Sequence, residues 1–173
     1  MIRILDLADA KGRAQAYALR PSAGPPPDVA AIVSRIVADV RSRGDAALRE
    51  LTHRFDGPDL AEPFLSATEW TELESRCELD VRSALEKAAE RVRAFHSPQL
   101  PQSYEQRLPD GGMLKSLAIP LARVACYVPG GRAAYPSTVI MTAAVARLAG
   151  VPDVIVATPP RRDGTVPPAV AAA

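Results

Sequence analysis

The sequence predicts an α/β protein in which amino-terminal helices lead into an incomplete Rossmann-like nucleotide-binding domain. Three observations predict this fold. Apolar residues recur at helical spacing through the first half of the chain, and after Gln99 they alternate as in strands. From Arg123 to Thr158 the order is strand, glycine-containing turn, helix and strand, which is typical of a nucleotide-binding crossover.

The first helices are predicted on both sides of a Pro/Gly-rich segment, Arg20–Pro27. Asp28 is the expected N-cap of the second helix, and Gly44 is its expected end. Between them the apolar residues follow helical spacing: Val29, Ile32, Val33, Ile36, Val37 and Val40.

Three further helices are expected before residue 100. Asp45 can cap the first, and Ser66 with Glu69 forms a capping-box pattern for the second. Asp80 precedes a long amphipathic helix that Pro98 closes. We therefore predict an amino-terminal helical region over residues 1–100.

Residues 101–173 are predicted to hold a hairpin and the first part of an α/β NAD-binding domain. Alternating residues flank the turn at Pro109–Gly112, which predicts the hairpin. The strand Val124–Val128 follows, then an almost wholly apolar helix, Ser137–Ala149, and the strand Asp153–Thr158. The helix should be covered on several sides.

For several candidate residues the sequence favours a structural role over a functional one. Ser137 and Thr138 are expected to cap their helix rather than to contact substrate. The two histidines, His53 and His96, lie in different predicted helices and are read as structural, and Cys126 as a core residue. The charged loop that begins at Arg161 has two alternative roles: a solvent-exposed loop, or a contact with a phosphate group.

Composition narrows the possible classes of protein. A hydrophobic fraction of 47% with 24% charged residues is that of a globular protein, and a net charge of +1 offers no electrostatic case for binding nucleic acid or membrane. The amino terminus lacks the apolar core of a signal peptide, and no apolar run reaches membrane-spanning length. Cys77 and Cys126 lack metal-type spacing and are expected to be reduced, buried thiols of a cytoplasmic protein.

Four blocks of sequence resemble the histidinol dehydrogenase family, in the family's order. They are R-S-R-G-D-A-A-L-R-E-L-T-H-R-F-D-G (Arg41–Gly57), A-E-R-V-R-A-F-H-S-P-Q (Ala89–Gln99), the run from Arg123 to Val151 that contains Y-V-P-G-G, and V-I-V-A-T-P-P (Val154–Pro160). The resemblance implies an NAD-dependent oxidation of L-histidinol to L-histidine in histidine biosynthesis. It also implies a zinc ion, a homodimer and, in a complete protein, a sheet like that of aldehyde dehydrogenases.

The same resemblance implies one ligand contact in this chain. In the family the tyrosine of Y-V-P-G-G contacts NAD, which corresponds to Tyr127 here, and Gly130 and Gly131 shape the turn beside it. For the two glycines, a plain turn without a ligand remains an equal alternative.

The family's zinc ligands and its Glu-His proton-transfer pair lie farther along the sequence than this chain extends, so no catalytic or metal residue is assigned here. We expect a chain cut in mid-domain, because Pro167–Ala173 resembles only the first turn of a helix. We therefore expect the 173-residue chain alone to be inactive. The alternative is a non-catalytic truncated module with at most partial binding of NAD or of a partner.

Overall fold

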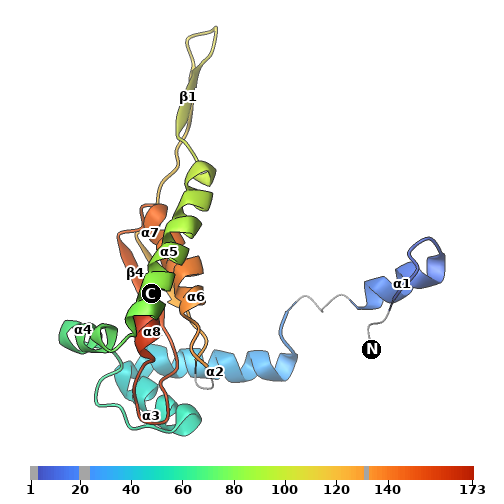
Figure 1. The fold of residues 1–173 in the computed structure, drawn as a ribbon. Helices are drawn as coiled ribbons and strands as arrows, with labels where there is room; N and C mark the ends of the chain where they lie inside the picture. The colour runs from blue at the N-terminus through green and yellow to red at the C-terminus, as the bar shows by residue number, and fades with distance from the viewer. Residues whose placement is uncertain (1–3, 20–23, 131–132) are drawn as a thin grey trace. The chain divides into compact units, whose positions relative to one another are not determined.

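The structure, a computed structural model, describes residues 4–19, 24–130 and 133–173. The chain forms two compact units, Met1–Gly44 and Asp45–Ala173. Helices and strands are both present, as the sequence predicts (Figure 1). The division into regions 1–100 and 101–173 stays a prediction.

The first unit contains helices α1 (Ala10–Ala18) and α2 (Pro27–Arg43). The prediction that Asp28 caps α2 is wrong. The helix begins at Pro27, whose fixed φ suits the first helical position, and Asp28 lies in the first turn. Gly44 ends α2 as predicted, with a φ of 58° and its N–H donating to the Val40 carbonyl at 2.8 Å. Residues 20–23 of the predicted loop lie outside the described residues.

The second unit begins with α3 (Asp45–Asp56), α4 (Ala67–Ser75) and α5 (Leu79–His96), followed by the short helix η1 (Ser97–Gln99). The predicted capping box of α4 is confirmed. The Glu69 N–H donates to Ser66 Oγ at 3.2 Å, and the Ser66 N–H donates to Glu69 Oε2 at 2.7 Å. Asp80 does not precede α5 but lies in its first turn, where a carboxylate suits the helix dipole.

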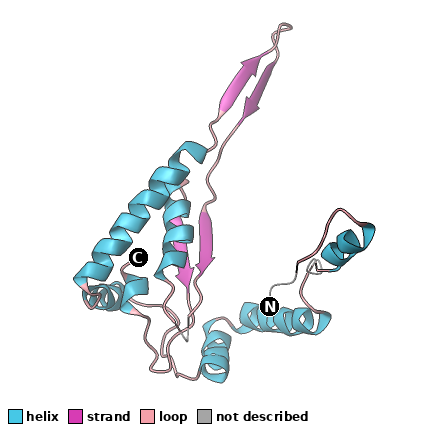
Figure 2. Cartoon of the chain, turned by 45° about the vertical axis from the view of Figure 1, so that its right-hand side comes forward, coloured by secondary structure: helices cyan, strands magenta, loops and turns pink. Residues whose placement is uncertain are grey.

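The predicted hairpin is confirmed as β1 (Tyr104–Arg107) and β2 (Met113–Ser116). The strands pair antiparallel with Tyr104 opposite Ser116, and Gly111 supplies the positive φ of 88° in the turn. Every residue of both strands is exposed. In both views this ribbon extends away from the strands and helices that form the core of the same unit (Figures 1 and 2).

The predicted crossover is present as a parallel strand pair joined by a helical segment (Figure 2). Strand β3 (Arg123–Tyr127) pairs in register with β4 (Asp153–Ala157), and the Val128 N–H extends the ladder to the Ala157 carbonyl at 2.8 Å. The connecting helical segment consists of α6 (Pro136–Val139), η2 (Ile140–Ala144) and α7 (Val145–Leu148).

Two details of this connecting helix differ from expectation. Ser137 and Thr138 do not cap it: the N-cap is Tyr135, without a side-chain hydrogen bond, because Pro136 allows the helix to start earlier. The helix is also not covered all round, since Ile140 is buried whereas Met141 is exposed.

The middle of the connecting helix, η2, widens into a π-helical turn. Thr142 Oγ1 donates to the Thr138 carbonyl at 2.6 Å, so a side-chain hydroxyl takes the oxygen that a regular α-helical N–H would use. We attribute the widening to this competition.

The core of the second unit gathers residues from α4, the end of β3, the connecting helix and α8 (Pro168–Ala171). Its buried members are Leu73, Val128, Val139, Val166, Val170 and Ala171. Val156 of β4 packs against this cluster. The core therefore lies on one side of the β3–β4 pair, the side that the connecting helix covers.

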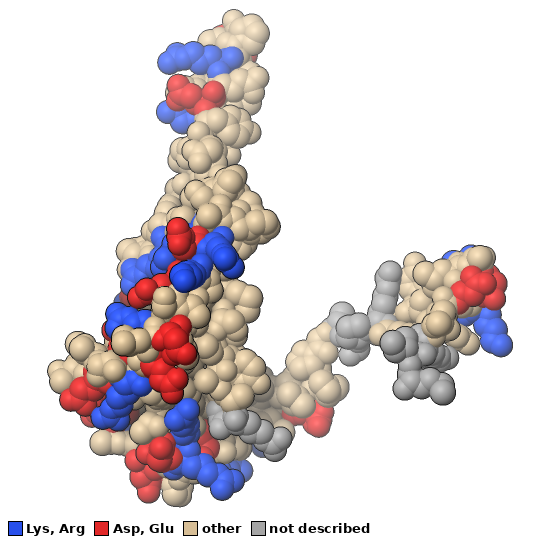
Figure 3. Space-filling view, viewed as in Figure 1, with Lys and Arg blue, Asp and Glu red and all other residues tan. Residues whose placement is uncertain are grey.

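Charged side chains of both signs are interspersed on the face of the second unit drawn in Figure 3. Several form ion pairs: Arg82, for example, reaches Glu74 at 2.7 Å and Glu86 at 3.4 Å. Among the described residues no helix is both long enough and apolar enough to cross a membrane.

The capping box of α4 leads to a prediction about acid stability. Hydrogen bonds from the Ser66 hydroxyl and then from the Ser66 N–H hold the pKa of Glu69 below its ordinary value of 4.5. A lowered pKa in the folded state stabilises the fold above pH 4.5, and this contribution is lost as the pH falls through the lowered value. Ser66→Ala should therefore reduce the loss of stability between neutral pH and pH values below 4.5, measured by urea unfolding.

Ser75→Ala is the matched control, because the Ser75 hydroxyl donates only to the Glu72 carbonyl at the other end of α4. This variant should keep the parent's pH dependence. An unchanged pH dependence in Ser66→Ala would contradict the prediction.

Candidate functional site

The candidate site lies at the carboxyl ends of β3 and β4, and Tyr127 is its aromatic side chain. Cys126 and Val128, on either side of Tyr127, are buried, with Val128 at 0% exposure. Successive side chains of a strand point to opposite faces, so Tyr127 lies on the face of the pair opposite the core. It is 67% exposed. The ring is therefore available to a ligand.

Gly130 brings the turn after β3 against the end of β4. A Cβ atom at Gly130 would lie 2.9 Å from the Pro159 carbonyl oxygen and 3.0 Å from Thr158 Oγ1. Cβ atoms essentially never approach another heavy atom as closely as 2.9 Å, so a side chain does not fit here unless its neighbours move. Gly130 is not among the glycines with positive φ, so close approach of the backbone, not an unusual dihedral, requires glycine.

Thr158 follows β4 directly and lies below this turn. Its Oγ1 atom is buried and finds no hydrogen-bond partner in the part of the chain that the structure describes. Buried hydroxyls without a partner are uncommon, because leaving one unpaired costs about 1–3 kcal/mol. The end of β4 thus holds a polar group whose bonding capacity is unused.

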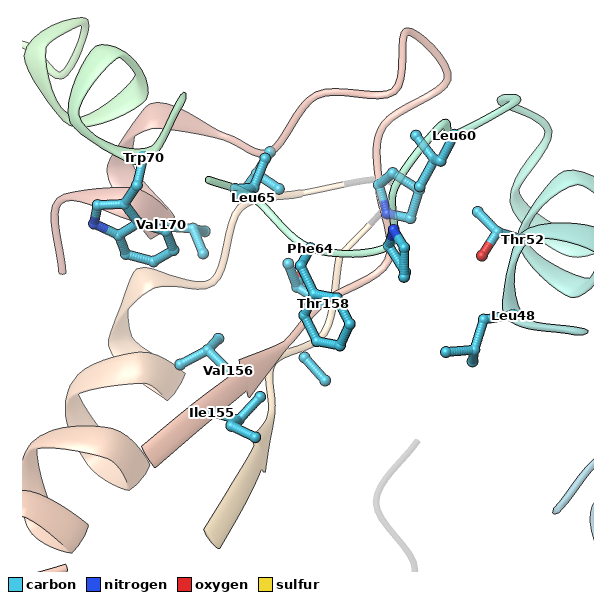
Figure 4. Close-up of a pocket in the computed structure, with 14 residues that line it drawn as sticks. Leu48, Thr52, Leu60, Phe64, Leu65, Trp70, Ile155, Val156, Thr158 and Val170 are labelled. Carbon is cyan, nitrogen blue, oxygen red and sulfur yellow. The ribbon is translucent and has the colours of Figure 1, made fainter. Parts of the chain in front are cut away.

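A cavity of about 390 Å³ adjoins the same strand end (Figure 4). Ile155 and Val156 of β4 line it from the strand, and Phe64 and Trp70 line it from earlier segments of the chain. The remaining lining residues are Leu48, Thr52, Leu60, Pro63, Leu65, Ala157, Thr158, Pro160, Val166 and Val170. None of these described lining side chains is ionisable, so the cavity suits an apolar group.

The other sequence candidates do not join this site. His53 Nδ1 pairs with Asp59 at 2.9 Å, and His96 Nδ1 lies 3.1 Å from Gln99 Oε1, both on the surface. Cys126 is a buried free thiol in the core, as predicted. Gly131 lies outside the described residues.

The loop after β4 is organised around a carboxylate. Asp163 Oδ1 accepts from the Thr165 hydroxyl at 2.7 Å and from the Thr165 N–H at 3.0 Å. These two bonds, with Arg161 nearby, hold the pKa of Asp163 below its usual range. The arrangement orders the loop, and phosphate contact by Arg161 stays a prediction.

Comparison with known proteins identifies the family. The family model described as histidinol dehydrogenase matches residues 21–173. This chain belongs to the histidinol dehydrogenase family. It is 48% identical over 147 residues to the histidinol dehydrogenase of Methanosarcina barkeri, covering 84% of this chain and 34% of that protein. It is 39% identical over 170 residues to that of Xanthomonas euvesicatoria, covering 98% of this chain and 39% of that protein.

A solved structure agrees with the sequence comparisons. The crystal structure of histidinol dehydrogenase from Elizabethkingia anophelis superposes with a TM-score of 0.81 at 28% identity, over 91% of this chain and 36% of that one. The chain thus spans about a third of the length of the Methanosarcina relative that it matches.

Sequence reasoning on this member of the family named two of the residues that the structure brings together at the candidate site. Tyr127 and Gly130 lie at the same strand edge, as expected from their order in the turn. Thr158 is not among the residues that the sequence singles out, although its place at the carboxyl end of a predicted strand is a usable signal. The segment that carries Phe64 was also missed, because no periodic pattern there predicts contact with a strand almost a hundred positions away.

The close approach of Gly130 yields a stability prediction. Gly130→Ala should destabilise the chain by about 1–3 kcal/mol, because a backbone oxygen and a buried hydroxyl must move to admit the methyl group. Gly112→Ala is the matched control: its new Cβ would meet only side-chain atoms, at 3.0 Å or more, and its φ is ordinary. Equal urea midpoints for both variants would contradict the account of Gly130.

Proposed function

We propose that this chain supplies part of the NAD site of a histidinol dehydrogenase, an enzyme that oxidises L-histidinol to L-histidine in histidine biosynthesis. The observation that carries the proposal is the strand edge itself. An exposed aromatic ring, a backbone approach that only glycine permits and an unpaired hydroxyl meet at the carboxyl ends of two parallel strands. Ligands of open α/β sheets bind at this kind of edge.

The residues present fit a dinucleotide. Tyr127 offers a ring face for stacking, which suits a base or nicotinamide. At Gly130 the backbone carries no side chain to block a phosphate or ribose. We propose that β3, the connecting helix and β4 begin a Rossmann-like domain of the aldehyde dehydrogenase type, within residues 101–173.

Each residue has a binding role in this proposal. Bound NAD supplies the acceptor for the hydride that leaves the alcohol. Tyr127 orients the cofactor, and Gly130 leaves room for it where the turn begins.

Zinc does not fit the described part of this chain. No group of three His, Cys, Asp or Glu side chains there could hold a metal ion. The family's zinc would therefore be held by residues other than those described here. We further propose that the complete protein is a cytoplasmic homodimer.

A non-catalytic module is the second candidate. The face of the strand pair opposite the core exposes Ile155, and Phe64 is also exposed beside it. Such apolar surface can bind a partner. The two candidate functions predict different results when the remainder of the family's sequence is supplied: histidinol oxidation for the first, and none for the second.

The functional test compares the chain alone with a completed protein. The completed protein is a chimera in which this chain replaces the matched portion, 39%, of the Xanthomonas euvesicatoria relative. We expect the chimera to reduce NAD with histidinol and the purified chain alone to be inactive with or without added zinc. Turnover by the isolated chain, or an inactive but folded and zinc-loaded chimera, would contradict the proposal.

Tyr127 tests the cofactor contact within the chimera. Tyr127→Ala should weaken NAD binding by about 1–3 kcal/mol, the effect of removing an aromatic stacking platform, with zinc content unchanged. Tyr104→Ala is the matched control, because Tyr104 is 66% exposed, close to the 67% of Tyr127, but lies on the hairpin. Tyr127→Phe separates the ring from the hydroxyl. Normal NAD titration curves for both Tyr127 variants would make it a packing residue.

A further inference from the structure

The Thr158 hydroxyl, near the candidate site, is buried without a hydrogen-bond partner among the described residues. By contrast, Thr165 in the following loop has its hydroxyl bonded to Asp163 at 2.7 Å. Two threonines near one strand end thus differ in a way that sequence alone does not show. Leaving the Thr158 hydroxyl unpaired carries a free-energy cost that hydrogen bonding would relieve.

The geometry limits what can relieve this cost. Oγ1 is inaccessible, so a ligand at the strand edge cannot reach it directly in this conformation. A Cβ atom at Gly130 would lie 3.0 Å from Oγ1, so the backbone of Gly130 packs close to the hydroxyl. A change that brings the Gly130 N–H or carbonyl within hydrogen-bond distance of Oγ1 would pair the hydroxyl.

We propose that Thr158 is a positioning residue of the cofactor site, whose hydroxyl forms a hydrogen bond with the Gly130 backbone when a dinucleotide occupies the edge of β3 and β4. This inference rests on the proposed function, because it takes the ligand to be NAD. A ligand favours the conformation that it binds better, so a hydrogen bond made only in that conformation adds to its affinity. Thr158 thereby couples the end of β4 to the turn that follows β3.

Two substitutions separate the hydroxyl from the methyl group. Thr158→Val keeps the shape and removes an unpaired polar group, so the melting temperature of the chain should stay level or rise. The same variant of the chimera should bind NAD about three- to tenfold more weakly, the worth of a typical hydrogen bond. Thr158→Ser keeps the hydroxyl and loses a buried methyl group, so it should melt lower but bind NAD within about twofold of the parent.

Thr165→Val is the matched control. It removes a hydroxyl that is already bonded, so it should not raise the melting temperature, and NAD affinity should remain that of the parent. Calorimetric titration with NAD and thermal melts supply the two readouts, and neither requires turnover.

The opposite orders of the two variants decide the inference. The inference is supported if Thr158→Val is at least as stable as the parent and binds NAD less well, while Thr158→Ser melts lower and binds NAD as the parent does. NAD affinity of Thr158→Val equal to the parent's overturns it, as does a Ser variant that binds as weakly as Val. If Tyr127→Ala also leaves NAD affinity unchanged, the proposed function fails; if only the Thr158 variants do, this inference alone fails.

Discussion

The close packing of the Gly130 backbone against Thr158 and Pro159 is the constraint on which the candidate site depends. It brings the ends of β3 and β4 together beyond their last paired residues, and the hydrogen bond from Val128 to Ala157 continues the ladder to that point. Because a Cβ would meet a backbone oxygen at 2.9 Å, glycine at this position follows from packing density and needs no ligand to explain it. Because Gly130 has no side chain, the strand edge is also open to a ligand.

Burial of Val128 then fixes which way Tyr127 faces. The residue after Tyr127 belongs to the core cluster with Val139 and Val170, so the strand cannot rotate without exposing it. The connecting helix covers one face of the two-stranded sheet, and the opposite face carries exposed Ile155 and borders the cavity that Phe64 lines. Parallel sheets are ordinarily covered on both faces, which agrees with a chain that spans about a third of its Methanosarcina relative.

Local signals predicted most of the elements, and contacts across the chain account for what they missed. The capping box at Ser66, the end of α2 at Gly44 and the hairpin depend on neighbours within a few residues, so the pattern sufficed. The capping pattern puts two helix starts too late, at Asp28 and Ser137, because a proline precedes each of them and its fixed φ suits the first helical position. The unpaired Thr158 hydroxyl and the cavity depend on segments that meet only in the folded chain, and no spacing rule encodes them.

The most direct test of the account is a crystal structure of the chimera with bound NAD. It should show the dinucleotide along the carboxyl ends of β3 and β4. A ring of the cofactor should stack on Tyr127, and a phosphate or ribose should lie over the Gly130 backbone. A cofactor bound elsewhere, with Tyr127 still exposed to solvent, would contradict the assignment of this strand edge as part of the NAD site.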